Sequence, residues 1–131
     1  MHAERRMASI RQAASIENAL LRFKDVGVVI DQLEKWQRAG DSAESRQLTG
    51  RLDLGRLGMS GHSFGAVTTQ AVSGQRSAKG DISFTDPRIK AAVIMSPNAP
   101  RAGDAKKAFA EVRIPWLLMT GTRDVAPVGD A

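Results

Sequence analysis

The pentapeptide G-H-S-F-G at residues 61–65 constrains the fold more than any other feature of the chain. It has the form G-x-S-x-G and directly follows a short apolar run at residues 56–60. A stretch compatible with a helix, residues 66–72, comes after it. This order predicts a strand, a sharp turn and a helix, with Ser63 at the turn. Because such a turn strains the backbone, we expect that a Cβ atom at either glycine would crowd the neighbouring strand or helix.

The remaining apolar segments predict an α/β fold. Apolar side chains recur at helical spacing over residues 26–36, which indicates a helix packed on a sheet and ending near Gly40. Continuous apolar runs at 89–95 and 116–119 predict buried strands, with a short helix at 104–111 between them. Such runs are typical of parallel strands covered by helices on both faces. Helices that alternate with parallel strands define the α/β class.

Three other segments carry weaker signals. Residues 1–21 have only a loose helical pattern, and we expect a poorly defined N-terminal segment there. Residues 41–51 and 75–87 are polar and rich in turn-forming residues, which predicts loops. The sequence therefore predicts one domain, over residues 22–131.

Composition narrows the classes of partner. Nineteen Lys and Arg residues against fourteen Asp and Glu give a net charge of +5, but the basic residues are scattered along the chain. Aromatic residues make up 5% and tyrosine is absent, so stacking platforms for nucleic acid are scarce and we expect no nucleic-acid site. No apolar run approaches a membrane span, and the N-terminus lacks the apolar core of a signal peptide. The absence of cysteine excludes disulfides and thiolate metal sites and leaves the cellular compartment open.

A carboxylate that could orient the base of a serine nucleophile follows the last apolar run. A serine hydroxyl needs a base, usually histidine, and a group that orients that base. Asp124 comes shortly after the strand predicted at 116–119, and folds with parallel strands place their sites in the loops beyond the strand ends. We therefore expect Asp124 to be the acid, with Asp130 as a weaker alternative.

The base is not evident from the sequence. The chain contains only two histidines, His2 and His62. His2 precedes the serine in a segment without a clear fold. His62 is adjacent to Ser63, and neighbouring residues of an extended segment project in different directions. We expect His62 to help orient the turn, not to act as the base.

These segments together resemble one family. The pentapeptide and its flanks are similar to bacterial dienelactone-hydrolase-like proteins, themselves similar to the platelet-activating-factor acetylhydrolase group of α/β-hydrolases. The resemblance spans about residues 22–128. It is carried by R-F-K-D at 22–25, I-D-Q-L at 30–33, R-L-G-M-S-G-H-S-F-G-A at 56–66, D-P-R-I-K-A at 86–91, S-P at 96–97, I-P at 114–115 and M-T-G-T-R-D at 119–124.

The resemblance implies a carboxylic-ester hydrolase that works by acyl transfer on a small-molecule ester, without a metal or cofactor. Ser63 would be the nucleophile, Asp124 the triad acid, and the backbone N–H of Phe64 an oxyanion donor. The other positions that it assigns are the turn residues Gly61, His62 and Gly65 and the rim of the site, Ser96 and Asn98.

The chain also departs from the family pattern. It holds equivalents of only the fifth to seventh strands, about three parallel strands, so we expect a central fragment of the α/β-hydrolase fold. The histidine loop and the loop that carries the second oxyanion donor have no equivalent in the sequence. We therefore expect esterase activity close to background. The alternative is a non-catalytic α/β-hydrolase-like binding module or a degenerate gene fragment. Substrate preference and oligomeric state stay open.

Overall fold

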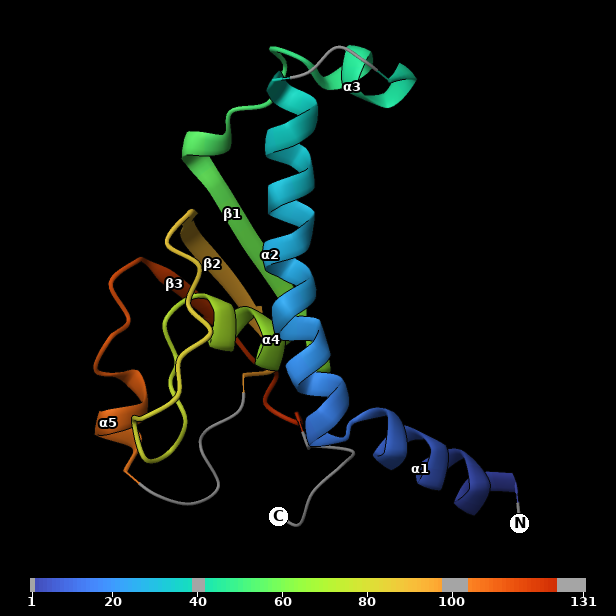
Figure 1. Ribbon diagram of the computed structural model, residues 1–131. Coiled ribbons are helices and arrows are strands. Elements are labelled where there is room, and N and C mark those ends of the chain that lie inside the picture. Colours follow the sequence, from blue (N-terminus) through green and yellow to red (C-terminus); the bar gives the residue numbers. More distant parts are fainter. Residues whose placement is uncertain (1, 39–41, 98–103, 125–131) are drawn as a thin grey trace.

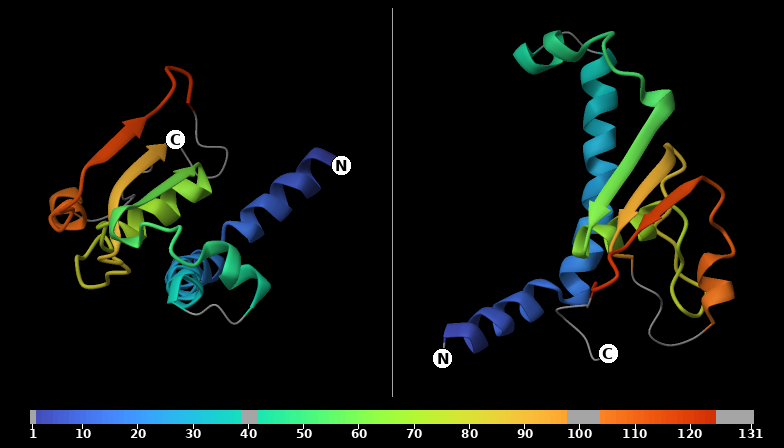
Figure 2. Two further views of the ribbon diagram at one scale, coloured as in Figure 1. Left: turned by 90° about the horizontal axis from the view of Figure 1, so that it is seen from above. Right: turned by 180° about the vertical axis from the view of Figure 1, so that it is seen from behind.

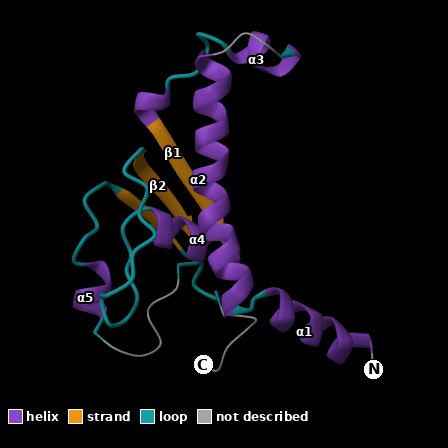
Figure 3. Cartoon of the chain, in the orientation of Figure 1, coloured by secondary structure: helices purple, strands orange, loops and turns teal. Residues whose placement is uncertain are grey.

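The computed structural model describes residues 2–38, 42–97 and 104–124 (Figure 1). Its elements are, in chain order, α1 (His2–Ala13), α2 (Ile16–Arg38), α3 (Ala43–Leu48), the 3₁₀ turn η1 (Leu54–Arg56), β1 (Leu57–His62), α4 (Phe64–Val72), β2 (Ile89–Met95), α5 (Ala105–Phe109) and β3 (Trp116–Met119). The three strands form one parallel sheet in the order β1-β2-β3, with helices beside it (Figure 3). The predicted α/β arrangement with three parallel strands is confirmed.

The strand register brings the carboxyl ends of all three strands to one edge of the sheet. His62, the last residue of β1, is opposite Met95, the last residue of β2. Met95 is in turn opposite Met119, the last residue of β3. The segments that follow the three strands therefore begin side by side, although up to 57 positions separate them in sequence.

Three helices, α2, α4 and α5, lie on one face of the sheet (Figure 1). α4 contacts β1 and β2, and α2 packs against α4. Two clusters of buried side chains lie between these helices and the sheet, one formed by Ile30, Val72 and Ile89 and the other by Ala66, Ala92 and Ile94. From α5, Phe109 makes an edge-on contact with Trp116, which packs against the second cluster. The core therefore lies on the side of the sheet that carries α2, α4 and α5.

The opposite face of the sheet carries no helix in the part of the chain that the structure describes. Seen from behind, the three strands face the viewer without a helix across them (Figure 2). On this face, Leu117 is 57% exposed and Met119 is 49% exposed. The expectation that both faces are covered is wrong for the described residues. Connections between parallel strands are nearly always right-handed, so crossovers that advance in one direction along a sheet lie on the same face. This rule accounts for α4 and α5, which connect β1 to β2 and β2 to β3.

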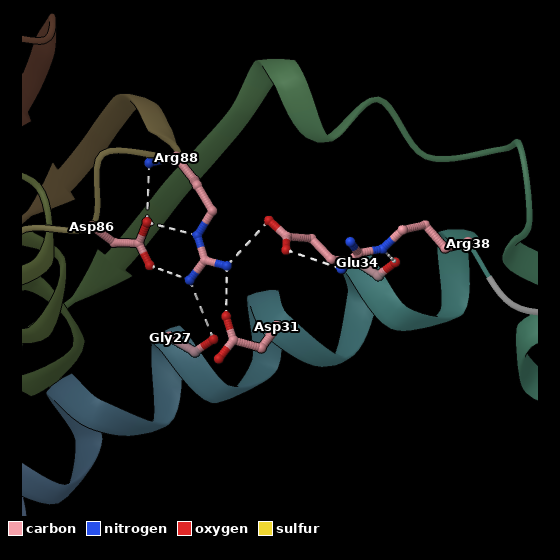
Figure 4. A network of polar contacts seen from close by, with 6 residues as sticks. All are labelled: Gly27, Asp31, Glu34, Arg38, Asp86 and Arg88. Carbon is pink, nitrogen blue, oxygen red and sulfur yellow. Dashed lines mark hydrogen bonds and ion pairs between the residues drawn. The ribbon is translucent and has the colours of Figure 1, made fainter.

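A partly exposed network of ion pairs joins α2 to the start of β2 (Figure 4). The Arg88 guanidinium donates to both carboxylate oxygens of Asp86, at 2.9 and 2.6 Å. It also donates to Asp31 at 2.6 Å and to Glu34 at 3.2 Å, both on α2. These bonds hold the pKa of Asp86 below its usual range, because the Arg88 hydrogen bond favours the ionised form. The network fixes where α2 lies relative to the sheet.

One segment differs from the sequence prediction. Within 41–51, predicted as a loop, the structure contains α3. The Ser42 side chain accepts from the Ser45 backbone N–H, and the Ser45 hydroxyl accepts from the Ser42 N–H, so a reciprocal cap starts this helix without any apolar period. Within 1–21, the structure contains α1 and the first residues of α2, and position 22 lies inside α2.

The two other helices predicted from the sequence are present with different bounds. The helix expected at 26–36 lies within α2, which begins ten residues earlier, at Ile16, and the helix expected at 104–111 corresponds to the shorter α5. Gly40, predicted to stop the first of these helices, lies outside the described residues. Among the described helices, none combines the length and the apolar character needed to cross a membrane.

Candidate active site

Ser63 occupies a strained turn between β1 and α4. Its backbone angles are φ 55° and ψ −116°, a sparsely populated region for a residue with a side chain. The turn is held from both sides: the Ser63 N–H donates to the Met95 carbonyl at 3.1 Å, and the Ser63 carbonyl accepts from the Ala66 N–H at 2.9 Å. Such a conformation costs about 1–3 kcal/mol and persists only where the surroundings enforce it. The serine therefore sits at the carboxyl edge of the sheet in a conformation that the fold imposes.

The two glycines of the pentapeptide have different roles. A Cβ atom at Gly61 would overlap the Gly65 carbonyl and lie 2.6 Å from Thr69 Oγ1, so only glycine fits there. At Gly65, a Cβ atom would meet no heavy atom within 4 Å. The expected crowding is therefore found at Gly61 and is wrong for Gly65. The physical reason is that the Gly65 carbonyl, not its Cβ position, faces the strand.

Phe64 begins α4 directly after Ser63. As the first residue of a helix, it has a backbone N–H without an intrahelical acceptor, as an oxyanion donor requires. The Arg22 guanidinium, on α2, lies 4.7 Å from the centroid of the Phe64 ring. This cation–π contact ties the first turn of α4 to α2.

Ser96, at the end of the neighbouring strand, shares the positive φ of Ser63 and the partner position of its N–H. It follows the last residue of β2 and has φ 57°. Among the described residues, Ser63 and Ser96 alone combine a positive φ with a side chain. The Ser96 N–H donates to the Met119 carbonyl at 2.8 Å, just as the Ser63 N–H bonds to the Met95 carbonyl. Sequence reasoning placed Ser96 at the rim of the site but gave no indication of this backbone conformation.

Asp124 lies in the turn after β3, and two hydroxyl groups hold its carboxylate. The Thr120 hydroxyl donates to Asp124 Oδ2 at 2.9 Å, and the Asp124 N–H donates to the Gly121 carbonyl at 3.1 Å. The Ser96 side chain also hydrogen-bonds the carboxylate. The Ser96 bond, the Thr120 bond and the nearby charge of His62 lower the pKa of Asp124, in that order of effect. Thr120 was missed from sequence, because its link to Asp124 depends on how the turn closes.

His62 ends β1 with an exposed side chain. It is close enough to Asp124 for its charge to favour the ionised carboxylate. Within the described residues, no hydrogen bond joins His62 to Ser63, so nothing in this geometry makes His62 the base. The side chain of His2 lies outside the described part of the chain, as do Asn98 and Asp130.

The structure therefore brings Ser63, Ser96, His62 and Asp124 to the carboxyl edge of one parallel sheet, where such folds place their sites. No group of three or more metal-ligating side chains occurs among the described residues. Comparison with protein-family models, with curated proteins and with solved structures finds no match to this chain. Arguments about function thus depend on the local geometry.

Proposed function

We propose that this chain carries the nucleophile and the acid of a serine hydrolase that acts on carboxylic esters by acyl transfer. The observation that carries the proposal is the conformation of Ser63, strained at a strand-to-helix turn, with no room for a Cβ atom at Gly61. A serine in this position presents its hydroxyl above the sheet edge and beside the N-terminus of α4. No simple structural requirement explains a strained serine there, since glycine would adopt the same backbone without cost.

In the proposed reaction, Ser63 Oγ forms a bond to the ester carbonyl carbon while its proton passes to a base. The carbonyl oxygen becomes an oxyanion, which the Phe64 N–H stabilises. The tetrahedral intermediate then expels the alcohol, which takes the proton from the base. Water attacks the resulting acyl-serine by the same route and releases the acid. Asp124 orients the base through its carboxylate.

The base is the part of this machinery that no described residue supplies. Removing the base from a serine triad costs on the order of a millionfold in rate. We therefore expect ester hydrolysis by the chain alone to be close to background. Imidazole added to the solution supplies the same chemical group and tests whether the rest of the site is in place.

The test is covalent labelling of Ser63 with a fluorophosphonate probe, measured by intact mass at increasing imidazole concentration. We expect an adduct whose rate of formation rises with imidazole and that is lost in Ser63→Ala. Ser60→Ala is the matched control, because Ser60 is an exposed serine of β1, the strand that precedes Ser63. A folded wild-type chain that forms no adduct at any imidazole concentration would contradict the proposal.

The second candidate function, a non-catalytic binding module, is favoured by one observation. The helix-free face of the sheet carries the exposed apolar side chains Leu117 and Met119. Apolar side chains exposed on a sheet face are one feature of contact sites for other macromolecules. A chain that fails to label at Ser63 yet stays folded would favour this function.

A further inference from the structure

We propose that Ser96 and Thr120 are positioning residues that hold the Asp124 carboxylate at the carboxyl edge of the sheet, ready to orient an imidazole base. This inference rests on the proposed function, since it assigns to two residues a task within the same site. Neither residue contacts the reacting atoms. Both act through Asp124.

The backbone of Ser96 provides the first argument. A positive φ is rare for residues other than glycine, and glycine would adopt the angle of 57° without steric cost. The side chain retained at this position is a hydroxyl that hydrogen-bonds Asp124, a residue 28 positions further along the chain. The strain is thus associated with one specific polar contact between the end of β2 and the turn after β3.

The geometry of the turn after β3 provides the second argument. Thr120 is the first residue after β3, and its hydroxyl donates to Asp124 Oδ2 at 2.9 Å. The Asp124 N–H closes the same turn by donating to the Gly121 carbonyl at 3.1 Å. Asp124 is therefore fixed through its backbone and through its side chain, although the residue is exposed.

The Asp124 carboxylate can accept a further hydrogen bond from a base. An ionised carboxylate accepts about four hydrogen bonds, and the two hydroxyls use two of them. The remaining lone pairs are available for an imidazole N–H, which is the contact that orients the base in a serine triad. The two hydroxyls also lower the pKa of Asp124, because their hydrogen bonds favour the ionised carboxylate that accepts from an imidazole N–H.

The first test is an NMR titration of the Asp124 carboxyl carbon in a set of variants. Ser96→Gly removes one hydroxyl and keeps the positive φ without strain, and Thr120→Val removes the other with little change in shape. We expect the pKa of Asp124 to rise in each variant and to rise further in the double variant. Thr120→Ser should restore the wild-type value. Thr122→Val, an exposed hydroxyl of the same loop without a hydrogen bond to Asp124 in the described residues, should leave it unchanged.

The second test uses imidazole-dependent labelling of Ser63 in the same variants. If Asp124 orients the imidazole, loss of either hydroxyl should raise the imidazole concentration for half-maximal labelling by about fivefold, the effect of one ordinary hydrogen bond. The maximal rate at saturating imidazole should change less. A merely structural role would alter the melting temperature without changing this concentration.

The outcomes separate the two proposals. Labelling of the wild-type chain together with an unchanged Asp124 pKa in Ser96→Gly and Thr120→Val would overturn the positioning role alone. A wild-type chain that does not label at any imidazole concentration would overturn the proposed function and the catalytic task of Asp124 with it. A raised pKa together with a raised imidazole requirement supports the inference.

Discussion

Ser63 and Ser96 occupy equivalent places at the ends of neighbouring parallel strands, yet their surroundings differ. Both have a positive φ, of 55° and 57°, and each donates its N–H to the last residue of the next strand, at Met95 and Met119 respectively. The two serines therefore share the sign and size of φ and the acceptor position of the N–H bond. What differs is the segment that follows each serine.

Ser63 is followed by a buried helix, whereas Ser96 is followed by Pro97 and contacts an exposed loop. The turn at Ser63 brings the Gly65 carbonyl so close to Gly61 that a Cβ atom would overlap it. Ser96 has no glycine neighbour and hydrogen-bonds Asp124. The difference indicates that a strained strand end is not sufficient for a nucleophile. The N-terminus of α4, which follows Ser63, supplies the backbone N–H that the proposed nucleophile needs. The hydrogen bond to Asp124 gives Ser96 its proposed role, which is to position that carboxylate.

The largest expected effect is the loss of the Ser63 turn in Gly61→Ala. We expect this substitution to lower the free energy of unfolding by about 3 kcal/mol or more, because the new methyl group overlaps backbone atoms that cannot move freely. The matched control is Gly65→Ala, which has open space and should stabilise the helix by about 0.5 kcal/mol. Urea unfolding of both variants measures the difference. Equal stabilities would contradict the packing described for the turn.

The next largest effect is the change in stability when the strain at Ser63 and at Ser96 is relieved. Ser63→Gly keeps the positive φ without steric cost, whereas Ser63→Ala keeps both the angle and its strain, so the glycine variant should be more stable than the alanine variant by about 1 kcal/mol. The same comparison at Ser96 should also favour glycine, since both Ser96 variants lose the bond to Asp124. Thermal unfolding of the four variants checks this. Alanine variants as stable as the glycine variants would show that the positive φ is not strained.

A smaller effect is expected in the pH dependence of the stability that Asp124 contributes. Because hydrogen bonds lower the pKa of Asp124 in the folded chain, its ionised carboxylate contributes stability above the unfolded pKa of about 3.9. That contribution is lost as the pH falls through the folded pKa. The stability difference between wild type and Asp124→Asn should therefore shrink on acidification from pH ~5 to pH ~2. A difference that does not depend on pH would mean that the carboxylate is not held by Ser96 and Thr120.

The smallest effect is the change in the pKa of Asp124 when His62 is replaced. Its charge is a weaker influence on the pKa of Asp124 than either hydroxyl. His62→Gln should raise the pKa of Asp124 by less than Ser96→Gly or Thr120→Val does, as measured by NMR titration. A larger shift in His62→Gln would instead identify His62 as the main partner of Asp124.

The sequence predicts the parts of this site that depend on local patterns. The spacing of the pentapeptide predicts the strand, turn and helix around Ser63, and continuous apolar runs predict the parallel strands. The sequence also places Asp124 in the turn after β3, because Asp124 comes shortly after the apolar run that forms this strand. These features are set by residues close together in the chain.

Features that depend on pairing between distant segments could not be predicted. The contact between Ser96 and Asp124 exists because the register places the ends of β2 and β3 side by side. The room for a methyl group at Gly65 depends on which atoms of the turn face β1. The helix-free face of the sheet depends on the order in which the strands pair, β1-β2-β3, because crossovers that advance in one direction lie on one face. No single segment of the sequence reveals that order.

The most direct test of the central claim is peptide mapping of the chain after fluorophosphonate labelling in the presence of imidazole. It compares the two strained serines in one experiment. The account predicts an adduct on Ser63 and none on Ser96, with the adduct lost in Ser63→Ala and reduced in Asp124→Asn. An adduct on Ser96, or no adduct on a folded chain, would contradict the assignment of Ser63 as the nucleophile.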